Sequence, residues 1–184
     1  MDGLVAKAKC GDRAAFGVLV RECQPMVLRT VFRLVRHEDD AMDLTQDAFV
    51  RAYERLDSFQ GTSSFGTWVC RIAINLALNH LRAQRPQADV DVARVAAPAP
   101  LSSESRERTV MERLDRAIAG LPPRQRLTVL LRVRDGKTHE EIASLLGCAV
   151  GTSKAAFHGA VANLRKALAD LVPLMEEDDE AHLP

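Results

Sequence analysis

One segment in the middle of the chain limits what the whole chain can fold into. The 24 residues RPQADVDVARVAAPAPLSSESRER, at 85–108, hold Pro, Ala or Ser at 11 positions and show no apolar stripe of helical period. This composition is typical of a flexible linker, which at about 3.3–3.6 Å per residue could span roughly 80 Å. In a chain of 184 residues it predicts two small domains, 1–84 and 109–173, followed by an acidic tail at 174–184.

Both domains are expected to be helical. Aromatic residues are only 4% of the chain, whereas Ala, Leu, Val and Arg are abundant, and this bias favours helix over strand. The prediction is therefore an all-α fold of two small helical domains joined by a flexible linker. No apolar run approaches the roughly 18 residues of a membrane span, and the start lacks a basic segment followed by an apolar one. We accordingly expect a cytoplasmic protein without membrane insertion.

The residues that usually carry catalysis or bind metals are dispersed. The cysteines are too far apart for a metal-binding spacing and are expected to be free thiols: Cys10, Cys23, Cys70 and Cys148. The chain has no Gly-rich phosphate loop, and its five histidines form no set with a nucleophile or a second ligand type. The sequence predicts no metal, no cofactor and no enzymatic activity.

Charge is unevenly distributed although the net charge is zero. Residues 61–84 contain two arginines and no acid, residues 109–172 carry a net charge of +4, and the tail contains EEDDE at 176–180. Two basic regions separated by a spacer favour two contacts with one long polyanion, while ordinary solvated surfaces remain the alternative. The tail is either a solubilising end or a segment that folds back on the basic second domain.

Apolar periodicity predicts four helices in the first domain. Asp12 caps the first, Pro25 separates it from the second, and Asp39 or Asp40 opens the third. The third helix is expected to bury Leu44, Ala48, Ala52, Tyr53 and Leu56. The loop SFQGTSS leads to a fourth helix at about 65–82, with Trp68, Ile72, Leu76 and Leu81 as its expected buried positions.

The second domain carries the spacing of a helix-turn-helix. A possible capping box at Thr109 and Glu112 opens its first helix, and Gly120 with Pro122 and Pro123 ends it. Thr138 and Glu141 form a second capping box before the short helix HEEIASLLG, where Gly147 provides the turn. The last helix is expected to extend from about 150 to 171, with its outward face at Gly151, Lys154, Ala155, His158 and Ala162. An ordinary helical hairpin is the alternative.

Both halves resemble one protein family. The segment LPPRQRLTVLLRVRDGKTHEEIASLLGCAVGTSKAAFHGAVANLRKAL resembles region 4 of the extracytoplasmic-function (ECF, group 4) RNA polymerase sigma factors. Likewise DDAMDLTQDAFVRAYERLDSFQGTSSFGTWVCRIAINLALNHLR resembles regions 2.2 to 2.4. The resemblance implies region 2 at 1–84, which binds core RNA polymerase and melts the −10 promoter element, and region 4 at 109–173, which reads the −35 element. It also implies contacts with the β′ clamp helices and the β flap, and control by an anti-sigma factor.

The resemblance assigns three sets of binding residues. The polymerase-binding face is Asp43, Gln46, Asp47, Phe49, Val50 and Glu54, where acids surround an apolar centre. The −10 set is Phe59, Gln60, Ser63, Ser64, Phe65, Trp68, Arg71, Asn75, Asn79 and Arg82, which includes rings that could stack on an unpaired base and a polar ridge. The −35 set is Thr138, Gly151, Thr152, Lys154, Ala155, His158 and Arg165. For the acidic face a plain solvated surface stays open, and for Phe59, Phe65 and Trp68 a place in the core stays open.

Several positions depart from the family pattern. Family members usually have a basic residue at Gly66 and Ile74, valine at Ser153, Ser-Arg at 155–156 and arginine at Gly159. We expect the changes on the DNA-facing surface to weaken promoter binding. Ser153 falls on the inward, otherwise apolar stripe of the last helix. Two functions remain open: a working sigma factor for an unusual promoter, or an accessory or anti-sigma-sequestering module that reads DNA weakly. A free-standing helix-turn-helix repressor would leave the first domain unexplained.

Overall fold

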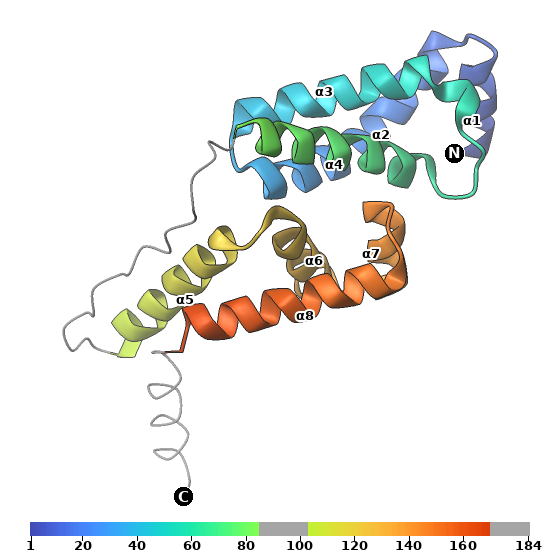
Figure 1. The fold of residues 1–184 in the computed structure, drawn as a ribbon. Helices are drawn as coiled ribbons and strands as arrows, with labels where there is room; N and C mark the ends of the chain where they lie inside the picture. Colours follow the sequence, from blue (N-terminus) through green and yellow to red (C-terminus); the bar gives the residue numbers. More distant parts are fainter. Residues whose placement is uncertain (85–102, 170–184) are drawn as a thin grey trace, which may run out of the picture.

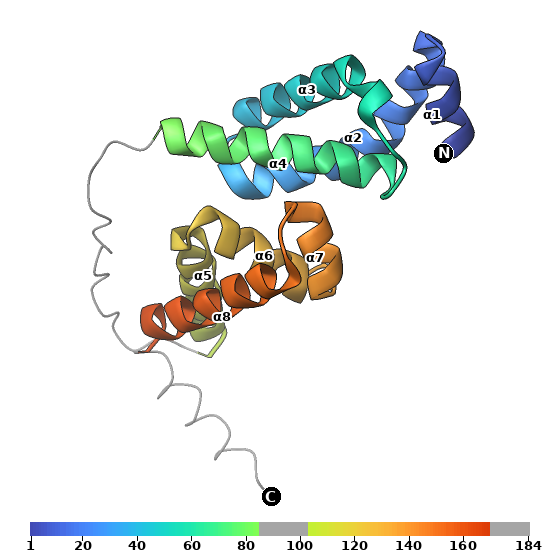
Figure 2. The ribbon, with the colours of Figure 1, turned by 45° about the vertical axis from the view of Figure 1, so that its right-hand side comes forward.

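The computed structural model describes residues 1–84 and 103–169, and this part of the chain contains helices and no strand. The first group of helices is α1 (Asp2–Lys9), α2 (Arg13–Val35), α3 (Glu38–Glu54), the 3₁₀ turn η1 (Leu56–Ser58) and α4 (Phe65–Ala83). The second group is α5 (Ser103–Gly120), α6 (Pro123–Val133), α7 (His139–Leu146) and α8 (Val150–Ala167). Figures 1 and 2 show the groups as two layers, which confirms the predicted all-α fold. No helix in the described ranges is long and apolar enough to span a bilayer.

Helix α2 is the central helix of the first group, and the fact that it is one continuous helix contradicts one prediction. Asp12 caps it by accepting a hydrogen bond from the backbone N–H of Ala15 at 3.0 Å, as expected. Pro25, however, lies inside the helix rather than between two helices. Cys23 and Val27 are both buried on the same face of the helix, and burial of this stripe against α3 and α4 outweighs the cost of about 3 kcal/mol for an interior proline.

Helix α3 begins at Glu38, one or two residues before the predicted start at Asp39 or Asp40. Its cap is His37, whose Nδ1 accepts a hydrogen bond from the backbone N–H of Asp40, so neither Asp39 nor Asp40 is the cap. Three acids occupy its first turn, where they favour the positive end of the helix dipole. Ala48, Ala52 and Leu56 are buried as predicted.

Helix α4 packs through its small residues. Its buried positions are Phe65, Gly66, Val69, Cys70, Ala73, Ile74 and Ala77. The predicted stripe of Trp68, Ile72, Leu76 and Leu81 is only partly buried and flanks the core. The prediction chose the wrong face of α4 because it assumed that the largest apolar side chains are the most buried. Close packing against α2 and α3 instead buries small side chains such as alanine and cysteine.

The second group matches the predicted helix-turn-helix, with one difference at its start. Helix α5 begins at Ser103, so Thr109 lies within the helix and is not its cap. Pro123 occupies the first turn of α6, where a proline is tolerated. Thr138 and Glu141 form the predicted capping box of α7, and Gly147 ends α7 in the left-handed conformation at φ +61°. Residues 103–108, predicted as the end of the linker, are instead the first residues of α5, because the helix extends further toward the N-terminus than its apolar stripe indicates. The rest of the predicted linker, 85–102, Leu171 and the acidic tail lie outside the described residues.

The two groups are in contact. Helix α7 packs against α4, and α6 packs against α2, as both views show. The length of the linker permits the two domains to lie apart or together, and nothing in the sequence indicates this particular contact.

Candidate functional site

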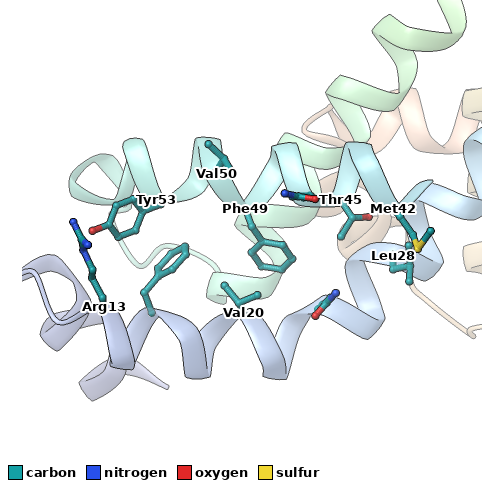
Figure 3. A pocket seen from close by; sticks show the side chains of 11 residues that line it. Arg13, Val20, Leu28, Met42, Thr45, Phe49, Val50 and Tyr53 are labelled. Atoms are coloured by element: carbon teal, nitrogen blue, oxygen red, sulfur yellow. The ribbon is translucent and has the colours of Figure 1, made fainter. Parts of the chain in front are cut away.

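An apolar groove lies between α2 and α3 (Figure 3), with a volume of about 660 Å³. Its lining combines side chains of both helices: Arg13, Phe16, Val20, Gln24, Leu28, Met42, Thr45, Gln46, Phe49, Val50 and Tyr53. Val50 is 50% exposed, and Met42 is also exposed, although both are large apolar residues. Exposed apolar grooves are typical of surfaces that bind another molecule.

The predicted polymerase-binding residues lie in and beside this groove. Gln46, Phe49 and Val50 line it, while Asp43, Asp47 and Glu54 are exposed on the same helix. Phe49 is buried and forms the floor of the groove between the helices. The site therefore combines an apolar centre with acidic side chains, which suits a partner that presents apolar and basic groups.

Tyr53 also belongs to the groove, although it was predicted to be buried in the core. It is 42% exposed and its ring lies edge-on to Phe16, with centroids 4.9 Å apart. The reason is its position one residue after Ala52, which occupies the core-facing position instead. The helical periodicity of α3 is compatible with both Ala52 and Tyr53 on the inner face. In the structure only the smaller residue, Ala52, is buried there.

Thr45 adds an unsatisfied polar group to the groove. Its side chain is buried, and its hydroxyl has no hydrogen-bond partner in the described part of the chain. A buried hydroxyl without a partner is unfavourable.

The rings predicted to stack on an unpaired base are packed together instead. Phe59 and Phe65 are 8% and 2% exposed, and their centroids lie 5.9 Å apart in an edge-on arrangement. Trp68 is tilted against both rings. Phe59 and Phe65 are therefore core residues in this structure, which is the alternative left open by the sequence. Stacking of either ring on a base would require the loop to rearrange. Gln60, Ser63 and Ser64 remain at the surface of the loop.

Helix α1 supports this loop, and the sequence analysis missed it. The ammonium group of Lys9 donates hydrogen bonds to the backbone carbonyl of Phe59 at 2.6 Å and to that of Asp57 at 3.4 Å. Together with Gln60 and Gly61, α1 lines a shallow hollow of about 310 Å³. The available sequence signal for an amphipathic helix was the pair of apolar residues Val5 and Ala8, three positions apart, and both are buried in the structure.

The predicted polar ridge of α4 is only partly free. Asn75, Asn79 and Arg82 are exposed, and an Nη atom of Arg82 lies 3.5 Å from the side-chain oxygen of Asn79. Arg71, in contrast, donates hydrogen bonds to the backbone carbonyl and the hydroxyl of Ser144 in α7. It would have to leave Ser144 before it could contact DNA.

The predicted −35 residues form an exposed face on α7 and α8. Gly151, Thr152, Lys154, Ala155, His158 and Arg165 are exposed, and Thr138 is exposed at the cap of α7. Glu140 and Glu141 lie beside this face, and backbone hydrogen bonds hold both of their pKa values below the usual range. The helix therefore presents a few basic groups and several small side chains to a partner.

Three departures from the family pattern lie in the core: Ser153, as its place on the inward stripe of the last helix predicts, and Gly66 and Ile74, for which the structure corrects the expectation of a DNA-facing position. Ser153 is fully buried, and its hydroxyl lies 3.1 Å from Nδ1 of His139. Ile74 is also buried, and a Cβ at Gly66 would lie 2.8 Å from Cε of Met26 and 3.3 Å from Sγ of Cys23. These positions are explained by packing within this chain.

Gly159 is explained by contact with α6. A Cβ at Gly159 would lie 2.9 Å from the amide nitrogen of Gln125, whose oxygen accepts a hydrogen bond from Asn163 at 2.9 Å. The absence of a side chain at this position lets the Gln125 amide lie on α8. No contact in the structure explains Ala155.

The thiols are free, as predicted. Burial raises the pKa of Cys70 to about 11 and also raises that of Cys23, so both stay protonated at neutral pH. Among the described residues, no three His, Cys, Asp or Glu side chains are grouped so that they could hold a metal ion.

Comparison with known proteins identifies both halves. Residues 19–87 match Sigma-70 region 2, and residues 111–164 match Sigma-70 region 4. The chain is 36% identical over 182 residues to the RNA polymerase sigma-H factor of Pseudomonas aeruginosa, covering 92% of this chain and 94% of that protein. It is 38% identical over 164 residues to the ECF RNA polymerase sigma-E factor of Escherichia coli K12, covering 81% of this chain and 84% of that protein.

Solved structures agree with the sequence comparison. CnrH, solved in complex with the cytosolic domain of CnrY, superposes with a TM-score of 0.63 at 26% identity and covers 92% of this chain and 96% of that one. A sigma factor RpoE solved in complex with the anti-sigma factor NepR from Bartonella quintana has the same fold, with a TM-score of 0.58 at 24% identity over 84% of this chain and 96% of that one. The chain belongs to the sigma-70 family of RNA polymerase sigma factors, in its extracytoplasmic-function group.

Proposed function

We propose that the chain binds core RNA polymerase through the groove between α2 and α3 and directs it to specific promoters. The observation that carries the proposal is the groove itself, an exposed apolar surface beside the acids Asp43, Asp47 and Glu54. It suits helices that present apolar and basic side chains, and the proposed partner is the pair of β′ clamp helices. The proposed role is one of binding, without catalysis, and places the protein in the cytoplasm with the polymerase.

The two domains would contact the two promoter elements. In the first domain, the surface groups Gln60, Ser63 and Ser64 and the ridge of α4 are proposed to read and open the −10 element. In the second domain, α8 is proposed to enter the major groove at the −35 element through Lys154, His158 and Arg165. The second domain is also proposed to contact the β flap.

An anti-sigma factor is proposed to control the protein. This proposal is supported by the similarity to CnrH, which was solved with the cytosolic domain of CnrY.

The test is to mix the purified protein with core polymerase and to measure complex formation and run-off transcription on genomic fragments, including the region upstream of its own gene. Discrete transcripts that require the protein are the expected result. Absence of a complex with core polymerase would contradict the proposal.

One observation favours a second candidate, the accessory or anti-sigma-sequestering module. The face of α8 is poor in long side chains, with Gly151 and Ala155 exposed. Each missing base contact removes about 1–3 kcal/mol of discrimination. A stable complex with core polymerase that gives no transcript from any fragment would favour this module.

A further inference from the structure

One side chain ties the N-terminal helix to the loop that precedes α4. Lys9 is the last residue of α1, which lies beside η1 (Figure 1). Its ammonium group donates to the carbonyl of Phe59 at 2.6 Å, in a partly buried contact, and to that of Asp57 at 3.4 Å. Hydrogen bonds from a charged donor are about twice as strong as those between neutral groups. Lys9 therefore fixes the point at which the chain enters the loop.

Phe59, at this entry point, is held by its side chain and by its backbone. Its buried ring lies edge-on to Phe65, with centroids 5.9 Å apart, and is tilted against Trp68 at 5.1 Å. Its backbone N–H donates to the carbonyl of Leu56 at 3.1 Å, and its own carbonyl accepts from Lys9. The ring contacts fix the side chain, whereas the bond from Lys9 fixes the direction in which the backbone continues.

The loop ends at a second fixed point, the cap of α4. The hydroxyl of Ser64 accepts a hydrogen bond from the backbone N–H of Thr67 at 3.1 Å and lies 2.9 Å from the Thr67 hydroxyl. The carbonyl of Ser64 accepts from the N–H of Trp68 at 3.0 Å, as in the first turn of a helix. These bonds are local and do not involve α1. Loss of Lys9 would therefore release the entry of the loop and leave its exit in place.

The residues between these two points, 60–63, depend on them for their position. Within the described part of the chain, their backbone groups form no hydrogen bond with other backbone groups. Gly61 adopts φ +73°, a left-handed conformation that glycine reaches without strain. A short surface segment without backbone hydrogen bonds of its own opens easily unless its ends are held. The tie from Lys9 is accordingly one of two constraints on the loop.

This loop presents polar groups of the predicted −10 set, namely Gln60, Ser63 and Ser64, at the protein surface. Groups that bind an unpaired DNA strand compete with re-pairing of the duplex, and they bind more strongly when they are already in place, since ordering a loop costs conformational entropy. A residue that orders the loop in the free protein therefore favours strand capture without a contact of its own to DNA.

We propose that Lys9 is a positioning residue for promoter opening: through the carbonyl of Phe59 it holds residues 60–64 in the arrangement that receives the unpaired strand of the −10 element. The inference rests on the proposed function, in which this loop contacts that element. Without the tie, only a fraction of the molecules hold the competent loop, and the apparent affinity for the open strand falls in proportion to that fraction. Binding of core polymerase is unaffected, because none of residues 57–64 lines the groove between α2 and α3.

The test uses the full chain and four variants. Lys9→Met removes the donor and keeps an unbranched apolar side chain, whereas Lys9→Arg keeps a charged donor at the same position. Lys9→Gln is a second neutral variant for the case in which Lys9→Met does not fold. Lys7→Met is the matched control, because Lys7 is an exposed lysine of the same helix and does not bond the loop.

Three quantities are measured for each variant. The first is the Kd for core polymerase, by fluorescence anisotropy. The second is the rate of strand opening by the complex with polymerase, by stopped-flow fluorescence of 2-aminopurine placed in the −10 element of a genomic fragment that gives a run-off transcript. The third is the dependence of the Kd for that fragment on salt concentration, which counts phosphate contacts.

For Lys9→Met we expect strand opening that is slower by about three- to tenfold, with the Kd for core polymerase within about twofold of the wild type. The salt dependence should not change, because the ammonium group of Lys9 is bonded to carbonyls and contacts no phosphate. Lys9→Arg should recover at least about half of the wild-type opening rate, since it retains a charged donor. Lys7→Met should leave the opening rate unchanged.

Opening rates in Lys9→Met and Lys9→Gln equal to that of Lys7→Met would overturn the proposal. Slower opening with a salt slope smaller by about one would overturn it as well, because Lys9 would then contact a phosphate directly. A parallel loss of polymerase binding would reduce Lys9 to a general structural role. A wild-type protein that opens no fragment would instead overturn the proposed function, and the role of Lys9 in opening with it.

Discussion

Nδ1 of His139 lies 3.1 Å from the hydroxyl of Ser153, and this contact joins the start of α7 to the buried face of α8. Phe157 covers it, with its ring centroid 5.7 Å from that of His139. A polar residue on the apolar stripe of α8 is therefore paired rather than unsatisfied. The hydroxyl that Ser153 places on the apolar stripe is therefore accounted for by its contact with His139.

The first prediction concerns this pair. Ser153→Ala should destabilise the protein by about 1 kcal/mol, because it removes the partner of a partly buried imidazole. A double-mutant cycle with His139→Ala, measured by urea unfolding, should give a coupling energy of about 0.5–1 kcal/mol. Thr152→Ala, at the exposed neighbouring position, should change stability by less than about 0.5 kcal/mol. Additive effects of the two substitutions would show that the contact contributes nothing.

The second prediction concerns the glycine inside α8. Gly159→Ala should stabilise the protein by about 0.5–1 kcal/mol, because alanine restricts the unfolded chain and favours helix. The new Cβ would approach only the amide end of Gln125, which is a flexible side chain. Thermal unfolding measures the change. Destabilisation instead would mean that the bond from Asn163 holds Gln125 too firmly for it to move.

The third prediction concerns Lys9 and the loop that it binds. Lys9→Met should leave the fold intact and lower stability by about 0.5–1.5 kcal/mol, since one charged donor to two carbonyls is lost. Amide hydrogen exchange at residues 57–63 should become faster while exchange in α3 is unchanged. Lys7→Met is the matched control, because Lys7 is an exposed lysine of the same helix. Equal exchange rates in the two variants would refute the role of Lys9 in positioning the loop.

The fourth prediction concerns the groove. Val50→Arg should weaken binding of core polymerase by at least about tenfold, because it places a cation at the centre of a surface suited to basic and apolar groups. The protein should remain folded, since Val50 is half exposed. Val133→Arg is the same substitution at another exposed valine, outside the groove, and should change affinity by less than about twofold. Anisotropy titration with labelled protein measures both, and equal affinities would place the polymerase elsewhere.

The fifth prediction concerns the titration of Asp135. The hydrogen bonds from Arg33 hold the pKa of this carboxyl below its usual value. Because the pKa is lower in the folded than in the unfolded state, the contact contributes stability above about pH 4 and loses it as the pH falls further. Carbon-13 NMR of the side-chain carboxyl should report the low pKa, and Arg33→Gln should return it toward the ordinary value. An identical titration curve in that variant would show that the ion pair does not persist in solution.

Much of the fold follows from local signals in the sequence. Asp12, Thr138 with Glu141, and Gly147 were correctly identified because capping and turn residues act over three or four positions. Helix α1 was missed because eight residues give only two buried positions. Pro25 was wrongly predicted to separate two helices, because the rule that proline breaks a helix takes no account of the apolar side chains that are buried on both sides of it.

The candidate site was less predictable, because it depends on which of two adjacent residues faces inward. Tyr53 and Ala52 were both acceptable on the inner face by periodicity, and so were Ile72 and Ala73. The contact between the domains had no sequence signal at all. Arg33 and Asp135 are 102 positions apart, and nothing in their surroundings distinguishes them from other surface charges.

The continuity of α2 through Pro25 has a mechanical consequence. One rod of 23 residues, about 35 Å long, carries groove residues such as Val20 in its first half and Arg33 and Leu34 near its other end. Pro25 removes one rung of hydrogen bonding near the middle, so the rod is most compliant there. Arg33 lies eight residues beyond the proline, about 12 Å along the helix axis, so a bend of about 10° at Pro25 would displace Arg33 by about 2 Å relative to the groove.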